Sequence, residues 1–193
     1  MNENVTLKSP SVNLIIGTNH SGKTTLVKKI INDDFKANGR RVLIVLYDDL
    51  EFDGFNWVEP EFLEKLNFQG ARKVIFYRGL LRNIIENFND GLIIFHDCAL
   101  FFRNNSNIPD LHSLLIRCRQ KMIDMVAVGH AFSELPPKLF IFTTQFTLFR
   151  TIGNIKKRRK VIQNFEELKA AQLRINEKAR TQPHYFETLF PHN

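Results

Sequence analysis

Short runs of apolar residues alternate along the chain with segments whose apolar positions recur at helical spacing. Uninterrupted apolar runs are typical of buried strands, and the clearest cover residues 12–16, 40–47, 73–77, 91–97, 125–129 and 140–149. The segments 23–35, 60–66, 80–88 and 109–122 have the spacing of helices with one apolar face. Because apolar strands that alternate with helices indicate a parallel sheet covered on both faces, the pattern predicts a three-layer α/β fold.

The pattern changes after Gly153. A run of consecutive cations comes first, formed by Lys156, Lys157, Arg158, Arg159 and Lys160. Residues 165–179 then have the apolar spacing of another helix, and Asn164 and Glu167 are placed as a capping box at its start. We therefore predict a core domain over residues 1–153 and a basic helical extension over residues 154–193.

Composition limits the class of protein. With 193 residues, 44% of them hydrophobic, the chain suits one globular α/β domain with a short appendage. Cys98 and Cys118 form neither a disulfide framework nor a CxxC metal pair. The first residues lack a basic segment followed by an apolar stretch, and no apolar run reaches the roughly 18 residues of a membrane span. We expect a cytoplasmic protein without a membrane span.

The strongest motif is a phosphate-binding loop of the form GxxxxGK[ST] between the first predicted strand and helix. Glycines let its backbone N–H groups turn toward phosphate oxygens, and the helix N-terminus faces the same anions. Lys23 is expected to reach the β- and γ-phosphates, and the Thr24 hydroxyl to ligate Mg²⁺. The residues predicted to bind a nucleoside triphosphate, ATP above all, are Gly17, Thr18, Asn19, His20, Ser21, Gly22, Lys23, Thr24 and Thr25.

P-loop enzymes hold Mg²⁺ through an acid at the end of another core strand, and residues 92–97 provide the candidate. If the apolar run ends at Phe95, His96 takes the Mg²⁺-linked position and Asp97 that of the catalytic base. If the run includes His96, Asp97 becomes the Mg²⁺-linked acid and Cys98 replaces the base. We predict Asp97 to be the essential acid and Mg²⁺ partner, with His96 as the alternative ligand.

Other polar residues also follow predicted strands. Asp48 and Asp49 end the second strand and suit either a water or Mg²⁺ contact or a plain turn. His130 ends the strand at 125–129, where an imidazole nitrogen could contact the γ-phosphate or the attacking water. Arg117 and Arg119 lie on the preceding helix, away from its apolar face. We predict Arg117 to act as a catalytic arginine finger in a neighbouring subunit, with Arg119 as the fallback and ordinary solvated arginines as the alternative.

With these residues in this order, the chain resembles the FtsK–HerA superfamily of ring-forming, DNA-pumping ATPases. The closest likeness is to the small genome-packaging ATPases of membrane-containing viruses and to zonula-occludens-toxin-like phage proteins. The resemblance covers residues 10–150 and implies a RecA-like P-loop NTPase fold of the ASCE division (additional strand, catalytic Glu), with a mostly parallel central sheet. Such enzymes have Asp-Glu and Thr-Gln where this chain has His96-Asp97 and Gly129-His130.

The excess of basic over acidic residues points to the kind of partner that the protein binds. Lys and Arg number 27 against 20 Asp and Glu, which favours a polyanionic partner. Together with the resemblance, this implies an ATP-hydrolysing DNA translocase that forms a homo-oligomeric ring at a capsid vertex or portal-type protein, in the host cytoplasm or on the virion. Residues 156–160 would contact DNA phosphates without regard to sequence, and a solvated tail is the alternative.

Two other functions remain open at this point. A small-molecule or nucleotide kinase would use Arg117 and Arg119 in a lid, and Asp48 and Asp49 at the acceptor site. A signalling or partitioning switch would bind ATP and turn it over slowly.

Overall fold

A computed structural model describes residues 10–48, 51–102 and 107–191, without the side chains of 35–38. It contains an eight-stranded sheet of order β3-β4-β2-β5-β6-β1-β7-β8, in which β8 alone among the described strands is antiparallel to its neighbour. The strands are β1 (Val12–Ile16), β2 (Arg41–Leu46), β3 (Asn56–Trp57), β4 (Ala71–Ile75), β5 (Gly91–Phe95), β6 (Ile123–Gly129), β7 (Gln145–Leu148) and β8 (Glu187–Leu189). The helices are α1 (Lys23–Asn38), α2 (Pro60–Leu63), α3 (Leu80–Asn87), α4 (Cys98–Phe102), α5 (Ile108–Gln120), α6 (Pro137–Phe142), the 3-10 helix η2 (Ile155–Arg158) and α7 (Phe165–Lys178).

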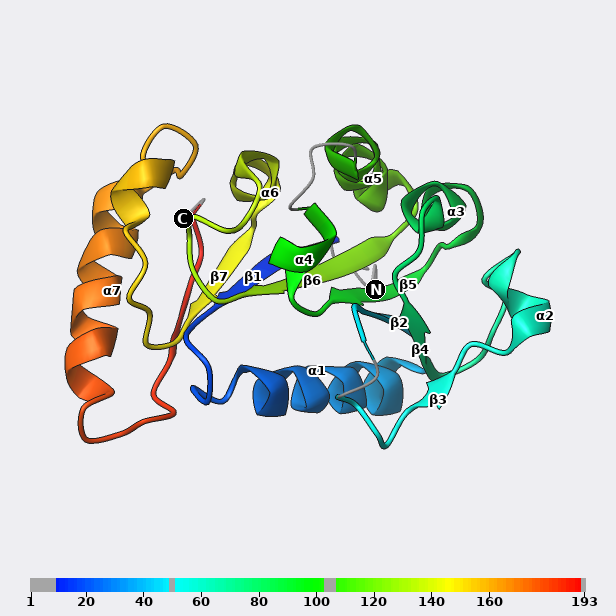
Figure 1. Ribbon diagram of the computed structural model, residues 1–193, viewed down its shortest axis with the longest axis horizontal. Coiled ribbons are helices and arrows are strands. Elements are labelled where there is room, and N and C mark those ends of the chain that lie inside the picture. Colours follow the sequence, from blue (N-terminus) through cyan, green and yellow to red (C-terminus); the bar gives the residue numbers. More distant parts are fainter. Residues whose placement is uncertain (1–9, 49–50, 103–106, 192–193) are drawn as a thin grey trace, which may run out of the picture.

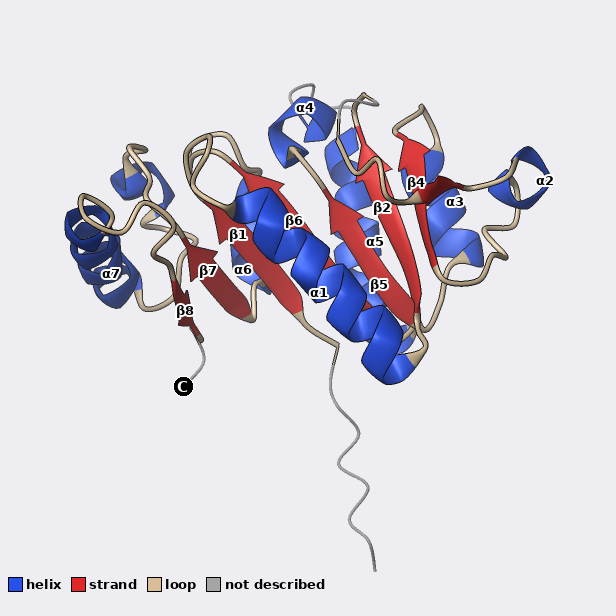
Figure 2. Ribbon diagram, turned by 90° about the horizontal axis from the view of Figure 1, so that it is seen from below, coloured by secondary structure: helices blue, strands red, loops and turns tan. Residues whose placement is uncertain are grey.

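Helices cover both faces of the sheet (Figures 1 and 2). α1 runs across one face, where Val27 and Ile31 pack against strand residues such as Ile15 and Ile44. α3, α4, α5 and α6 cover the other face, and α7 stands beside the β7–β8 end. Because alternate strand side chains enter the two layers, every residue of β1 and β5 is buried. Among the described residues, no helix has the length and apolar character needed to cross a membrane.

The P-loop strand β1 is an interior strand of the sheet. It pairs with β6 on one side, in the register Val12↔Met125, and with β7 on the other, in the register Asn13↔Gln145. β6 therefore lies between β1 and β5, and it is the additional strand of the ASCE arrangement. The predicted three-layer, mostly parallel P-loop NTPase fold is confirmed.

Some predicted boundaries were wrong. The apolar run at 140–149 is not one strand, because Pro136 and Pro137 begin α6, which continues through Phe142 before β7 starts at Gln145. The strand predicted at 91–97 ends at Phe95, since Asp97 has a positive φ of 59° that no strand accommodates. The short elements β3, α4 and β8 were not predicted, because segments this short carry too few residues to show a period.

The C-terminal extension is built into the sheet. β8 pairs with β7 in the register Thr147↔Thr188, so residues after 153 complete an edge of the core in addition to forming a helix. Asn164 precedes α7 as predicted, but its backbone is left-handed with φ 50°. Its side-chain amide donates to the carbonyl of Pro191 and makes no cap hydrogen bond, so the predicted capping box does not form.

A buried carboxylate links the amino-terminal ends of three strands, at the end of the sheet opposite the P-loop. Asp124, at the start of β6, accepts hydrogen bonds from Ser11 N (2.6 Å), Ser11 Oγ (2.7 Å) and Arg40 Nη1 (2.5 Å). Burial alone would raise the pKa of Asp124, but these donors outweigh burial and lower it. The ionised group therefore stabilises the alignment of β1, β2 and β6.

Candidate nucleotide-binding site

The loop between β1 and α1 is held by the ends of the neighbouring strands. Gly17 N donates to the Gly129 carbonyl at 3.2 Å, and Thr18 N donates to the Arg150 carbonyl at 2.8 Å. A Cβ added to Gly17 would lie 2.5 Å from the Cβ of Phe149, so no larger residue fits there. The loop is thus fixed where its amides and the start of α1 face the same space.

That space is a cavity of about 620 Å³. Its walls come from the P-loop, from the ends of β5 and β6, from the loop after β2 and from the C-terminal extension. The lining residues are Asn19, His20, Ser21, Gly22, Lys23, Thr24, Thr25, Glu51, His96, Asp97, His130 and His184. The structure therefore brings the predicted P-loop residues 19–25 together with the predicted His96, Asp97 and His130, while Gly17 and Thr18 anchor the loop below them.

Lys23 lies buried at the start of α1, with its ammonium group inside the cavity. Its Nζ donates to the Thr18 carbonyl at 2.8 Å and lies 3.4 Å from His130 Nδ1. Burial lowers the pKa of Lys23, while the charges of Asp97 and Glu51 act in the opposite direction. A phosphate would replace these weak partners with strong charge-assisted ones.

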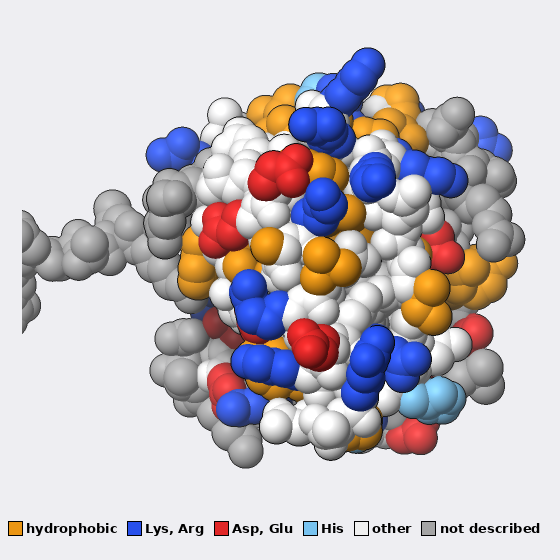
Figure 3. All heavy atoms as spheres, turned by 90° about the vertical axis from the view of Figure 1, so that its left-hand side faces the viewer, with side chains coloured by type: hydrophobic (Ala, Val, Ile, Leu, Met, Phe, Trp, Pro, Cys, Tyr) orange, Lys and Arg blue, Asp and Glu red, His pale blue; other side chains and the backbone are white. Residues whose placement is uncertain are grey.

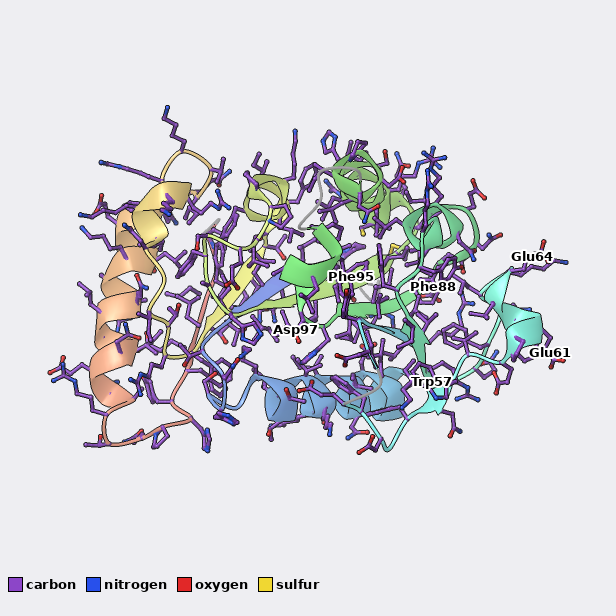
Figure 4. The ribbon with its side chains drawn as sticks, in the orientation of Figure 1. Trp57, Glu61, Glu64, Phe88, Phe95 and Asp97 are labelled. Carbon is purple, nitrogen blue, oxygen red and sulfur yellow. The ribbon has the colours of Figure 1, made fainter. Side chains whose placement is uncertain are left out.

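Asp97 and His130 join the ends of the adjacent strands β5 and β6. Asp97 Oδ1 lies 2.9 Å from His130 Nε2, and Figure 4 shows Asp97 between α4 and α1. Contact with the His130 ring lowers the pKa of Asp97, and the nearby His96 and Lys23 lower it further, against the effect of burial. Asp97 is therefore ionised at neutral pH.

His96 faces the P-loop hydroxyl. Its Nε2 lies 3.4 Å from Thr24 Oγ1, and its Nδ1 lies 3.1 Å from Glu51 Oε2. Burial lowers the pKa of His96, so the imidazole is neutral at pH 7. Cys98 is fully buried in α4 with its Sγ 3.5 Å from the Phe95 carbonyl. The structure thus places His96 beside Thr24 and leaves Cys98 outside the cavity lining, while Asp97 lines the cavity with His96.

Several buried polar atoms around the cavity are not satisfied. Among the described residues, Ser21 Oγ is buried without a hydrogen-bond partner, and Glu51 Oε2 and Asp97 Oδ1 have only poorly aligned contacts with His96 and His130. Leaving such a group unpaired costs about 1–3 kcal/mol. A hydrated magnesium–nucleotide complex fits these groups, because it brings both hydrogen-bond donors and phosphate acceptors into the cavity.

Two residues of the cavity were missed from the sequence. Glu51 belongs to the loop after β2. Of the two acids predicted in that loop, Asp48 is exposed and does not line the cavity, and Asp49 lies outside the described residues. His184 lies between α7 and β8 and returns over the P-loop, with its Nδ1 3.3 Å from the place of a Cβ on Gly22. The acid-rich stretch after β2 could have indicated Glu51, whereas His184 has no local signal.

The predicted arginine finger lies elsewhere on the molecule. Arg117 and Arg119 are both exposed on α5. Arg117 lines a separate surface cavity of about 290 Å³ together with Arg82, Glu86 and Asp110. Neither arginine lines the phosphate cavity of its own chain, so a catalytic role for either one requires a second copy.

The basic run is not uniform. Lys156, Lys157, Arg159 and Lys160 are exposed. Figure 3 shows Lys and Arg side chains spread over the face that lies at the left of Figure 1, interspersed with acidic ones. Arg158 instead donates to the carbonyls of Phe132 (3.0 Å), Ser133 (2.9 Å) and Leu135 (2.8 Å). Arg158 is therefore partly engaged by the loop after β6, unlike the exposed cations beside it, and its predicted contact with DNA stays a prediction.

The fold and the site define the P-loop NTPase fold with the ASCE strand arrangement. Among solved structures, the chain is similar to the genome packaging NTPase B204 from Sulfolobus turreted icosahedral virus 2 in complex with sulfate, with a TM-score of 0.73, 15% identity and coverage of 96% of this chain and 94% of that one. The DNA-packaging ATPase B204 from Sulfolobus turreted icosahedral virus matches with a TM-score of 0.66, 16% identity and coverage of 96% and 100%.

A more distant likeness is to the KaiC-like protein PH0186 from Pyrococcus horikoshii, with a TM-score of 0.51, 18% identity and coverage of 72% and 71%. No protein-family model matches the sequence, and no curated protein matches it. The resemblance expected from the sequence is confirmed at the level of the fold.

Proposed function

We propose that this protein is an ATP-hydrolysing DNA translocase that works as an oligomeric ring and packages a viral genome. The observation that carries the proposal is the convergence of Lys23, Thr24, Asp97 and His130 on one cavity at the carboxyl ends of β1, β5 and β6. Groups from adjacent strand ends and a P-loop are what phosphoryl transfer needs for positioning and charge stabilisation.

Each group has a distinct task in this proposal. The P-loop amides and Lys23 bind the β- and γ-phosphates, and the ionised Asp97 takes the proton from the attacking water. His130, in contact with both Asp97 and Lys23, holds the carboxylate in place and meets the γ-phosphate. Mg²⁺ held beside Thr24 and His96 would neutralise phosphate charge.

The packaging role is supported by the extent of the structural likeness. The B204 structures are matched over nearly the whole of both chains, extension included. The Sulfolobus turreted icosahedral virus 2 protein has been solved in complex with AMP, with ATP-gammaS and with AMPPCP. The exposed cations Lys156, Lys157, Arg159 and Lys160 supply a surface suited to DNA phosphates.

Ring assembly is supported by the position of the second cavity. A cavity of about 530 Å³ adjoins the phosphate site and shares Asp97 and His130 with it. Its outer walls are formed by α4 and by the loop that includes Glu134 and Pro136. A side chain from a neighbouring subunit could reach the γ-phosphate through it, and Arg117, exposed and remote from its own site, is the candidate.

The structure gives the kinase hypothesis no support. A kinase needs lid arginines over its own phosphate site, yet Arg117 and Arg119 lie on α5, away from the cavity. The proposed acceptor residue Asp48 does not line the cavity either.

The test is DNA-stimulated ATP hydrolysis, measured as phosphate release from the purified protein with and without duplex DNA. We expect stimulation by DNA and no phosphorylated small product. Lys23→Ala should reduce turnover by at least about 10²-fold, because it removes the side-chain cation from the phosphates. Lys29→Ala, an exposed lysine on the same helix, is the matched control. Near-normal turnover in Lys23→Ala would refute the proposal.

A further inference from the structure

The residue that faces the P-loop hydroxyl is an imidazole in this chain. His96, directly after β5, is 6% exposed, and its Nε2 lies 3.4 Å from Thr24 Oγ1. P-loop enzymes of this kind are expected to have a carboxylate at the end of this strand, an oxygen ligand suited to Mg²⁺. The substitution of nitrogen for oxygen changes which cation the position suits.

The surroundings of His96 determine which ring nitrogen is free. Nδ1 lies 3.1 Å from Glu51 Oε2 and 3.7 Å from Asp97 Oδ2. Two carboxylates on this side place the ring proton on Nδ1, which leaves the lone pair of Nε2 directed toward Thr24. Phe52 packs against the ring edge-on at 5.0 Å and fixes its plane.

This arrangement is the one that metal-binding histidines use. A ligating imidazole typically gives its other N–H to a carboxylate, which sets the tautomer and makes the free nitrogen more basic. Glu51 has that position here: its buried Oε2 lies 3.1 Å from His96 Nδ1 and has no other hydrogen-bond partner among the described residues. Asp97, the other acid of the cavity, contacts His130 instead at 2.9 Å.

The protein does not form the whole cation site by itself. Among the described residues, there is no cluster of three or more His, Cys, Asp or Glu groups placed to hold a metal ion. Thr24 and His96 provide two ligand atoms at most, so the phosphates of a bound nucleotide and water must provide the others. Cation and nucleotide should therefore bind together.

We propose that His96 Nε2 binds directly to the divalent cation that accompanies the nucleotide, and that the site therefore prefers Mn²⁺ or Co²⁺ to Mg²⁺. The inference rests on the proposed nucleotide-binding function. Imidazole nitrogen binds first-row transition metals well, while Mg²⁺ prefers oxygen ligands and retains its water. Glu51 is a positioning residue, since it acts on the cation only through His96.

The experiment uses Mn²⁺ as a paramagnetic probe with the non-hydrolysable analogue AMPPCP and the full chain. Pulsed electron paramagnetic resonance detects a nitrogen nucleus bonded to Mn²⁺, and labelling histidine with ¹⁵N identifies the source. We expect a histidine nitrogen coupling in the wild type and in His184→Gln, a histidine of the same cavity placed at Gly22. We expect none in His96→Asp, which restores an oxygen ligand.

Nucleotide affinity supplies a second measurement. The ratio of AMPPCP affinity with Mn²⁺ to that with Mg²⁺ should exceed about tenfold in the wild type and fall toward one in His96→Asp. Glu51→Gln should reduce the affinity measured with Mn²⁺ by about 10-fold or more, and Glu51→Asp should restore part of it. Glu51 is partly exposed, so these variants serve if His96→Asp fails to fold.

The outcomes separate the two claims. If AMPPCP binds with both cations but the wild type shows no histidine coupling, or the coupling persists in His96→Asp, the cation proposal is wrong and the nucleotide-binding function stands. If AMPPCP binds with neither cation, the proposed function fails and the cation proposal fails with it.

Discussion

Asp97 and His130 stand at the ends of adjacent parallel strands, and their side chains meet with Oδ1 and Nε2 2.9 Å apart. His130 also lies 3.4 Å from Lys23 Nζ, so the contact extends from the acid through the imidazole to the P-loop cation. A change of charge near Lys23 can therefore alter the electrostatics at Asp97 through the single intervening side chain of His130.

Removal of the Asp97 charge should separate catalysis from binding. We expect Asp97→Asn to lower ATP turnover by about 10²–10⁴-fold, because it removes the proposed general base, while ATP binding stays within a few-fold of wild type. Steady-state phosphate release and equilibrium nucleotide binding measure the two effects. Asp53→Asn, an exposed acid beyond the β2 end, should change neither. Full activity in Asp97→Asn would show that the base is another group.

The arginine prediction concerns a second subunit. Arg117→Ala should leave ATP binding nearly intact and reduce turnover by about 10³-fold, as trans-acting fingers do. Mixing Arg117→Ala with Lys23→Ala should restore part of the activity, because a hybrid interface pairs an intact P-loop with an intact arginine. Arg119→Ala is tested alongside as the fallback. A monomer at working concentration, or mixtures that stay inactive with both arginine variants, would contradict the ring.

The basic run should divide into two functions. Replacing Lys156, Lys157 and Lys160 with Gln should weaken DNA binding and reduce the log–log salt slope by about 0.9 for each lost phosphate contact. Arg158→Gln should instead lower the free energy of unfolding by about 1–3 kcal/mol, because three carbonyls lose their donor. DNA binding titrated with salt, and denaturant unfolding, distinguish these effects. If the salt slope is unchanged, the three lysines do not contact DNA phosphates, and their role is limited to keeping the protein soluble.

Acid should destabilise the protein partly through Asp124. Its folded-state pKa is lowered, so its contribution to stability is present above the unfolded value of about 3.9 and is lost as pH falls through the folded value. Asp124→Asn should cost about 1–3 kcal/mol at pH 7 and lose less stability than wild type on acidification. Denaturant unfolding between pH 7 and pH 3 measures this, with Asp33→Asn, an exposed acid on α1, as control. Parallel pH curves for Asp124→Asn and wild type would contradict the assignment.

The sequence predicted the core of the fold because its strands are long and apolar. The runs that form β1, β2, β5 and β6 are buried throughout or nearly so. Because helices cover both faces of a parallel sheet, such strands are apolar at successive positions and do not alternate between apolar and polar residues. The failure at residues 140–142 has a local cause: α6 is apolar and short, and a short apolar run does not distinguish helix from strand.

The sequence predicted the site residues that belong to the P-loop motif or directly follow a buried strand. His96, Asp97 and His130 follow buried strands, and the carboxyl ends of parallel strands meet at one edge of the sheet. Glu51 and His184 come from loops whose paths depend on tertiary packing, such as the contact of Phe186 with Phe149 at 5.0 Å. No spacing along the chain encodes those paths.

The interior position of β1 has a consequence for synthesis on the ribosome. Among the described strands, β1 pairs with β6 and β7, in the registers Val12↔Met125 and Asn13↔Gln145, so it has no sheet partner there until the much later residues of β6 have been made. Such non-local pairing slows folding and leaves apolar segments exposed in the meantime. The nascent chain should therefore gain the ability to bind nucleotide late and abruptly, once β7 has emerged, and should depend on chaperones before that point.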